Sequence, residues 1–244
     1  QVASLNQQLV EVLPDVILRP AGGPPLGGAW PMDEFLTPTG IAHCGQTPPV
    51  VYVVDTGIMP GHDEFNYPPS DPVLTFLPGI SYGDDVSILP PTPLPAYVDA
   101  HDHGTRVAAC IGGKSTGLLG LLGGSARMKS VLIYDSPAGG GGVATFVRKA
   151  INGVLACVAD HQARKLVPYM KNHASVLVFA HSTTVAGGRF ADLDAVLEIA
   201  WQSGLHVVLA AGNEGLPAVL VSPAGAAWGY VSGGPPVRFW FGAP

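Results

Sequence analysis

The sequence predicts an α/β fold in which a parallel β-sheet is covered by helices on both faces. Two kinds of segment alternate along the chain: short runs rich in β-branched residues, and longer stretches whose apolar residues recur at helical spacing. Short links between them favour right-handed crossovers, which make consecutive strands parallel. We expect strands near 50–54, 131–134, 175–180 and 205–210, and helices near 103–112, 143–160 and 192–203.

The composition argues against two classes of partner. The chain has 244 residues, enough for one large domain or two small ones with a substantial core. Only 12% of its residues are charged and its formal net charge is −6, which argues against a nucleic-acid surface. No apolar run approaches the roughly 18 residues that a membrane helix needs. We therefore expect neither nucleic acid nor membrane as a partner.

The first part of the chain is rich in loops, because 17 of its 24 prolines precede residue 96. We expect residues 1–48 to form a Pro/Gly-rich surface arm that begins with a lead-in helix over 1–18, and residues 49–244 to form the α/β domain. Residues 58–98 should be a loop with one or two short strands and solvated acidic side chains. The acidic residues in question are Asp63, Glu64, Asp71, Asp84 and Asp85.

The three cysteines, Cys44, Cys110 and Cys157, have no metal-site spacing. Three cysteines allow at most one disulfide within the chain. The redox compartment is therefore left open by the sequence.

Asp55 follows the continuous β-branched run from Val50 to Val54, which predicts a central strand buried on both faces. Open α/β sheets place their functional sites at the carboxyl ends of such strands. An isolated aspartate at a strand end is more often a turn former, so Asp55 alone does not define a site.

His103 falls in the first turn of the predicted helix over 103–112, whose apolar residues lie on more than one face. The positive end of the helix dipole disfavours the imidazolium there, and a neutral imidazole suits a general base. The alternative is a core histidine with satisfied hydrogen bonds. Further along, the strand near 205–210 leads into Asn213, a third polar residue at the end of an element.

These three residues stand in segments that resemble the motifs of the subtilisin-like serine proteases, the subtilase family. Val51–Ile58 is similar to the family's aspartate motif, Asp99–Ala108 to its histidine motif and Val207–Gly215 to its oxyanion-asparagine segment. Ser222-Pro223-Ala224 resembles the segment that usually follows. The resemblance spans roughly residues 48–225 and implies a subtilisin-like fold that is incomplete at its C-terminal end.

The resemblance also implies roles for individual residues. Asp55 would accept the Nδ1–H of His103, His103 would take the proton of a serine hydroxyl, and Asn213 would stabilise the oxyanion. Ser182, Thr183 and Gly212 would contact a polypeptide substrate or inhibitor. No cofactor is implied beyond the structural calcium of some family members, for which no site can be identified here. A secreted or vacuolar location is what the family implies.

The sequence departs from the family pattern in several places. It contains no Gly-Thr-Ser nucleophile motif, only 31 residues follow Asn213, and neither Ser222 nor Ser232 matches the nucleophile. Arg106 stands where a second histidine is usual. His181 to Thr184 replace the Ser-Leu-Gly-Gly substrate strand, which puts backbone pairing with an extended peptide in doubt.

Three interpretations follow. The chain is a stretch of a serine endopeptidase without its serine-bearing segment, an inactive pseudoprotease that binds or scaffolds, or a divergent hydrolase with zinc on His101, His103 and Asp99 or Asp102. The zinc-dependent hydrolase is the weakest of the three, because the spacing of these residues along the chain is a poor match to known zinc sites. Without the helix that carries the serine in the family, part of one sheet face would be uncovered and favour self-association.

Overall fold

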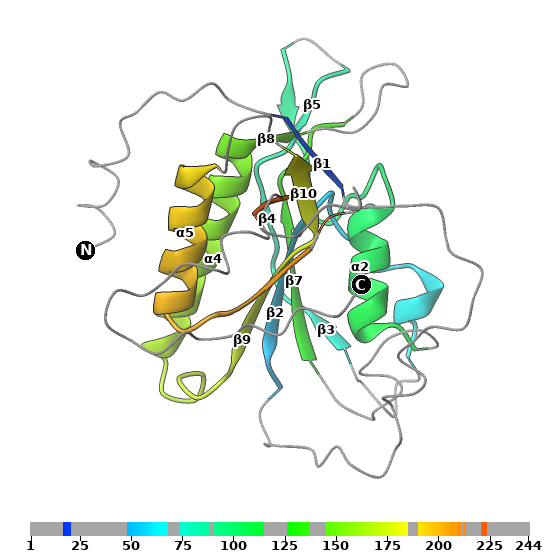
Figure 1. Ribbon diagram of the computed structural model, residues 1–244. Helices are drawn as coiled ribbons and strands as arrows, with labels where there is room; N and C mark the ends of the chain where they lie inside the picture. The colour runs from blue at the N-terminus through cyan, green and yellow to red at the C-terminus, as the bar shows by residue number, and fades with distance from the viewer. Residues whose placement is uncertain are drawn as a thin grey trace.

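A parallel sheet of six strands forms the centre of the molecule (Figure 1). Along the main path the strand order is β11-β9-β2-β7-β3, and β4 pairs with β7 beside it; all pairings are parallel. The strands are β2 (Val50–Asp55), β3 (Leu74–Phe76), β4 (Ile80–Ser81), β7 (Ala126–Leu132), β9 (Ser175–Phe179) and β11 (His206–Leu209). The computed structural model describes residues 17–20, 48–67, 74–87, 90–114, 126–136, 145–184, 190–210, 212 and 221–223.

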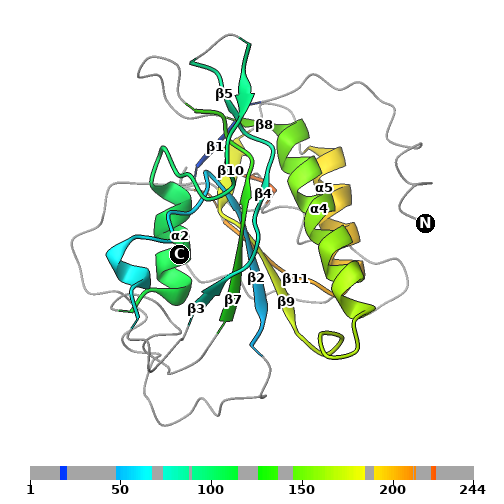
Figure 2. The same cartoon turned by 180° about the vertical axis from the view of Figure 1, so that it is seen from behind.

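Helices cover both faces of this sheet, as the sequence predicts (Figures 1 and 2). Helix α2 (His103–Gly112) lies on one face with the short 3₁₀ helix η2 (Asp63–Phe65) beside it. Helices α4 (Val147–Lys165) and α5 (Ala191–Gln202) lie together on the other. The predicted α/β class with a doubly covered parallel sheet is confirmed.

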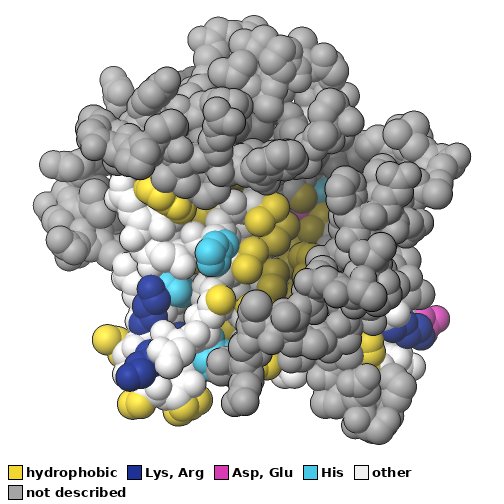
Figure 3. Space-filling view, turned by 60° about the horizontal axis from the view of Figure 1, so that its bottom comes forward, with side chains coloured by type: hydrophobic (Ala, Val, Ile, Leu, Met, Phe, Trp, Pro, Cys, Tyr) yellow, Lys and Arg dark blue, Asp and Glu magenta, His cyan; other side chains and the backbone are white. Residues whose placement is uncertain are grey.

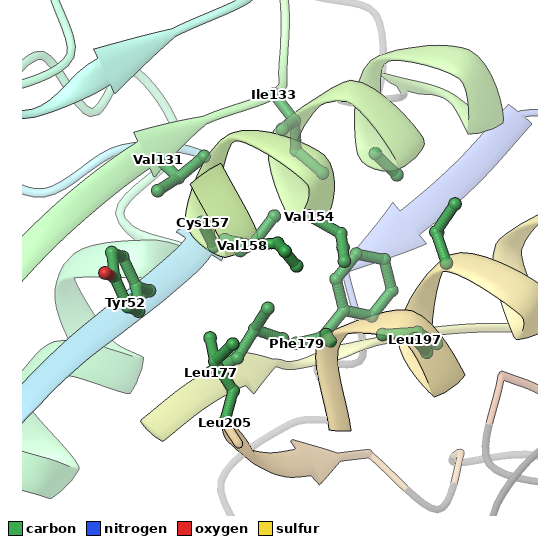
Figure 4. Packing of buried hydrophobic residues seen from close by; sticks show 14 of the residues in the cluster. Tyr52, Val131, Ile133, Val154, Cys157, Val158, Leu177, Phe179, Leu197 and Leu205 are labelled. Carbon is green, nitrogen blue, oxygen red and sulfur yellow. The ribbon is translucent and has the colours of Figure 1, made fainter. Parts of the chain in front are cut away.

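Two separate cores result from the alternation of side chains along β2. Val50, Tyr52 and Val54 pack into the cluster under α4 and α5, part of which Figure 4 shows. Val51 and Val53 point the opposite way, into a smaller cluster that includes residues of α2 and η2. All six residues of β2 are buried, which explains why the strand has no polar side until its last residue.

Cys157 of α4 is fully buried in the larger core and its thiol is free, as is that of Cys110. Burial raises the pKa of the Cys157 thiol above its usual range, so this side chain packs as a small apolar group. Cys44 lies outside the described residues.

The main differences from the predicted elements lie at β7, at α4 and in the stretch 58–98. β7 begins at Ala126, five residues before the expected start. The sequence did not predict this first part of the strand, because Arg127 and Lys129 interrupt the apolar pattern there. α4 begins at Val147 rather than near 143, because Thr145 and Phe146 form the short strand β8. The described residues of the stretch 58–98 contain four short strands rather than one or two: β3, β4, and the antiparallel pair β5 (Asp84–Asp85) and β6 (Thr92–Pro93).

Two of the acidic residues of this stretch have side-chain partners as well as contact with solvent; 40% of the Asp84 side chain is exposed. Asp84 forms an ion pair with Lys149 at 3.0 Å, and Asp85 accepts hydrogen bonds from the hydroxyls of Ser87 and Ser136. These hydrogen bonds hold the pKa of Asp85 below its usual value. Asp71 lies outside the described residues.

A second, antiparallel sheet has the order β12-β10-β1-β8. Its first and last members in the chain are β1 (Ile17–Pro20) and β12 (Val221–Ser222), and β10 is His181–Thr184. Arg19 and Pro20 pair with Ser182 and His181, so this part of the expected surface arm belongs to a sheet, contrary to the prediction. The expected lead-in helix falls almost entirely on residues outside the described part of the chain.

Strand β11 is the edge of the parallel sheet and exposes apolar surface. Val208 is 45% exposed and His206 is exposed beside it. Figure 3 shows one face of the molecule on which apolar side chains gather at the surface. Edge strands with apolar side chains favour association, but self-association of this chain stays a prediction. In the described part of the chain, no helix is long and apolar enough to cross a membrane.

An ionic network joins α4 to the sheet. The carboxylate of Asp160 accepts hydrogen bonds from Tyr52 Oη at 2.7 Å, Lys129 Nζ at 2.6 Å and Arg164 Nε at 3.0 Å. Burial alone would raise the pKa of Asp160, but these donors outweigh it and the pKa lies below its usual value. The charged form of Asp160 therefore stabilises the fold at neutral pH.

We expect Asp160→Asn to lower the free energy of unfolding by about 2 kcal/mol at neutral pH, because it leaves Lys129 and Arg164 partly buried without their anion. Because the pKa is lowered on folding, this contribution is present above the ordinary carboxyl pKa and is lost as the pH falls through the lowered value. Urea unfolding at several pH values measures it. The exposed Glu198→Gln on α5 is the control and should change stability by less than about 0.5 kcal/mol. An equal effect of the two variants would contradict the prediction.

Candidate active site

Asp55 and His103 meet where β2 ends and α2 begins. Asp55 is the last residue of β2 and is fully buried, and His103 is the first residue of α2 with 12% of its side chain exposed. His103 Nδ1 lies 2.8 Å from Asp55 Oδ1, which also accepts the backbone N–H of Thr56 at 2.7 Å. Since the buried carboxylate can only accept, His103 Nδ1 carries the proton, and the tautomer of His103 is fixed.

The buried carboxylate of Asp99 ties the start of α2 to the end of β2. Its Oδ1 accepts the hydroxyl of Thr56 at 2.8 Å and the backbone N–H groups of His101 and Asp102 at 3.1 and 2.9 Å. Its Oδ2 accepts the backbone N–H and the hydroxyl of Thr105 at 2.8 and 2.6 Å. Five donors compensate for the burial of this charge, so Asp99 shapes the turn that delivers His103 to Asp55.

The zinc site considered for His101, His103 and Asp99 or Asp102 is not assembled in the structure. His101 is exposed, and only its backbone N–H meets Asp99. Asp102 is also exposed; it caps α2 in the left-handed conformation, with φ 64°, and its side chain makes no capping hydrogen bond. Thr56 in the aspartate motif and Thr105 in the histidine motif were the available sign in the sequence that Asp99 is a structural acceptor.

Two glycines permit the close approach of β2 and α2. A Cβ on Gly104 would lie 2.1 Å from the carbonyl oxygen of Gly57 and 3.0 Å from the Cβ of Asp55. Gly57 itself has φ +110°, and a Cβ there would lie 1.9 Å from the Val98 carbonyl oxygen. The N–H of Gly104 uses the space to donate to Thr56 Oγ1 at 2.9 Å. The Gly that follows His103 is thus required by packing.

His181 also belongs to the site, and its contacts with Asp55 and His103 were not predicted from the sequence. Its ring is fully buried in β10 and lies between the rings of His103 and Tyr134, with centroid distances of 5.7 and 5.2 Å. His181 Nε2 donates to the carbonyl oxygen of Val54 at 2.9 Å and lies 3.4 Å from Asp55 Oδ2. His181 Nδ1 lies 3.1 Å from Tyr134 Oη and accepts a hydrogen bond from this hydroxyl, because Nε2 carries the single ring proton.

Burial decides the charge of this second imidazole. It lowers the pKa of His181, and the nearby His103 acts in the same direction, although the carboxylate of Asp55 opposes them. His181 is therefore neutral at neutral pH. Burial likewise raises the pKa of Tyr134, which keeps its hydroxyl protonated. No local sequence pattern predicts the hydrogen bond between His181 and Val54, because the two residues are 127 positions apart in the sequence.

The expected substrate-contacting residues are placed in part. Ser182 is buried and pairs with Arg19 of β1, and Thr183 pairs with Ser222 of β12. The segment thus forms an extended strand without the family's glycines, but the strands that pair with it belong to the same chain, so pairing with a peptide stays untested. Gly212 has φ +96°, a conformation that favours glycine.

Asn213 and Ser232 lie outside the described residues. Ser222 is buried in β12, and its hydroxyl accepts the backbone N–H of Phe190 at 3.5 Å. The roles predicted for Asp55, His103, Asn213, Ser182, Thr183 and Gly212 stay predictions, as geometry alone does not test them.

The site is a buried Asp–His pair at the carboxyl end of a central parallel strand of an α/β protein. A model of the subtilase family matches residues 47–232, and the chain belongs to that family. It is similar to a cuticle-degrading serine protease of Arthrobotrys oligospora, with 29% identity over 176 residues, 72% of this chain and 35% of the relative. A subtilisin-like serine protease of Rhodotorula mucilaginosa is 29% identical over 182 residues, 75% of this chain and 44% of the relative.

Among solved structures, the fold is similar to a cold-adapted subtilisin-like serine proteinase. The sequence identity is 26% and the TM-score 0.48, over 75% of this chain and 53% of that one. The chain spans about a third of the length of the first curated relatives it matches, 35% and 33%.

We expect Gly104→Ala to lower the free energy of unfolding by about 3 kcal/mol or more, although alanine is the better helix former, because its Cβ would overlap the Gly57 carbonyl. The matched control is Gly61→Ala, where an added Cβ meets nothing within 4 Å. Thermal and urea unfolding of both variants check the prediction. Equal stabilities of the two variants would show that α2 and β2 are not in this contact.

Proposed function

We propose that this chain supplies the aspartate and histidine of a serine endopeptidase that hydrolyses peptide bonds. The observation that carries the proposal is the 2.8 Å contact between Asp55 Oδ1 and His103 Nδ1 at the carboxyl end of β2, in a chain of the subtilase family. The similarity to proteins named as serine proteases supports the choice of reaction.

The geometry suits the chemistry in a specific way. Because Nδ1–H of His103 is donated to Asp55, the lone pair of the ring lies on Nε2, where it can accept the proton of a serine hydroxyl. Asp55 is buried and keeps its charge close to Nδ1, so it stabilises the imidazolium that forms during attack. His103 then returns the proton to the leaving amine, and Asn213 would donate to the tetrahedral oxyanion.

The serine is the part of this mechanism for which the sequence offers no match, since it contains no Gly-Thr-Ser. The second candidate function is therefore an inactive pseudoprotease that binds a polypeptide. One observation favours it: both edges of β10, the strand expected to pair with substrate, are paired with β1 and β12 of the same chain.

The proposed substrate class is polypeptide, and the proposed location is outside the cytoplasm. The relative from Arthrobotrys oligospora is named a cuticle-degrading protease, and degradation of a cuticle takes place outside the cell. The net charge of −6 gives no information on the substrate class or on the location.

We expect the protein encoded by the longest open reading frame that contains residues 1–244 to be labelled at one serine by a fluorophosphonate probe. His103→Ala should slow the labelling by at least about 10³-fold, because the serine loses its general base. The matched control is His101→Ala, two residues away with an exposed side chain, which should label at the wild-type rate.

Residues 1–244 alone should not be labelled. Labelling of the shorter chain, placed by mass spectrometry at Ser222, Ser232 or another serine, would contradict the expected position of the nucleophile. If the protein encoded by the longest reading frame is folded but is not labelled, the pseudoprotease interpretation is correct.

A further inference from the structure

We propose that Asp55, His103 and His181 together bind one transition-metal dication such as Zn²⁺. Each residue offers one ligand atom, and these atoms all lie within 4.8 Å of one another. Among the described residues, this is the one group of three or more His, Cys, Asp and Glu side chains that is placed in this way. The site requires only these three side chains, so it stands or fails separately from the proposed peptidase activity.

An unsatisfied buried oxygen points to a cation at this place. Asp55 is fully buried and its Oδ2 accepts no hydrogen bond. His181 Nε2 is 3.4 Å away, but its single proton is directed at the carbonyl oxygen of Val54. A buried carboxylate oxygen without a donor is costly, and a dication beside it would remove that cost.

The ligand types and spacings suit a tetrahedral metal. Zinc takes imidazole nitrogens and carboxylate oxygens at about 2.0–2.2 Å, which separates neighbouring ligand atoms by roughly 3.4 Å. The two imidazoles approach different oxygens of the carboxylate, Oδ1 at 2.8 Å from His103 Nδ1 and Oδ2 at 3.4 Å from His181 Nε2. With one ligand atom from each residue, the three atoms lie within 4.8 Å of one another and would draw closer around an ion. Two imidazoles argue against Ca²⁺ and Mg²⁺, which prefer oxygen ligands. Three protein ligands leave a fourth position for water or another donor.

The surroundings of His181 provide the support that a metal ligand needs. When Nε2 binds the metal, the ring proton moves to Nδ1, which then donates to the oxygen of Tyr134 at the present 3.1 Å. No net proton is released from this ring, because it is neutral in both tautomers. The Val54 carbonyl loses the His181 donor, and the metal–ligand bonds offset that loss.

Metal binding would oppose the proposed chemistry of the site. A metal on His103 Nδ1 forces the ring proton to Nε2, so the imidazole can no longer accept a proton from a serine. Bound metal would therefore act as a reversible inhibitor. This consequence, unlike the site itself, rests on the proposed function.

The test uses purified residues 1–244 freed of metal with a chelator. Co²⁺ is titrated while its visible ligand-field absorption is recorded, and Zn²⁺ binding is measured by equilibrium dialysis. We expect the wild type to bind one equivalent of each metal. His181→Gln should lose affinity by about 100-fold, because changes even to residues that only hydrogen-bond to metal ligands lower affinity by roughly 10–100-fold. His206→Gln on β11 is the matched control, because His206 is exposed, and should bind as the wild type does.

X-ray absorption of the zinc-loaded wild type keeps the test independent of how well His181→Gln folds. Two imidazoles and a carboxylate oxygen around the zinc would support the site. Sulfur ligands, fewer than two imidazoles, no stoichiometric binding, or full binding by folded His181→Gln would each overturn it. Absence of peptidase activity would bear on the proposed function and not on this site.

Discussion

The structure of the site depends on one buried carboxylate, that of Asp99. It receives hydrogen bonds from Thr56, just beyond β2, and from Thr105, in the first turn of α2. A carboxylate removed from water is stable only when donors surround it, so the two elements must meet in one geometry to supply them. That geometry brings His103 to Asp55. The dyad is thus a consequence of how the helix is attached to the sheet.

Packing on both sides of β2 enforces the same arrangement. The strand has no free face, because α4 and α5 cover one side and α2 the other, so its end is the first point at which a polar side chain can be used. Asp55 occupies that point and is surrounded by His103 and His181, with Tyr134 behind the second imidazole. The low polarity of the surroundings strengthens each of these contacts. It also makes it energetically costly that Asp55 Oδ2 accepts no hydrogen bond.

Much of this could be predicted from the sequence, and the rest could not for identifiable reasons. The β-branched run of β2 and the apolar faces of the three helices follow from periodicity, and Asp55 and His103 follow from motifs at element ends. The first half of β7 was missed because Lys129 and its neighbours pair with groups far away in sequence. His181 was missed because its partners Val54 and Asp55 are more than 120 residues away, and no local pattern encodes such a contact.

The most direct test of this account is the ¹⁵N–¹H NMR spectrum of the His103 ring in the wild type and in Asp99→Asn. The account predicts a protonated Nδ1 in the wild type, slow to exchange with water because Asp55 holds it. In Asp99→Asn the helix start should loosen and this proton should exchange faster, although Asp55 and His103 are unchanged. A proton on Nε2 in the wild type, or equally slow Nδ1 exchange in a folded Asp99→Asn, would contradict the central role of Asp99.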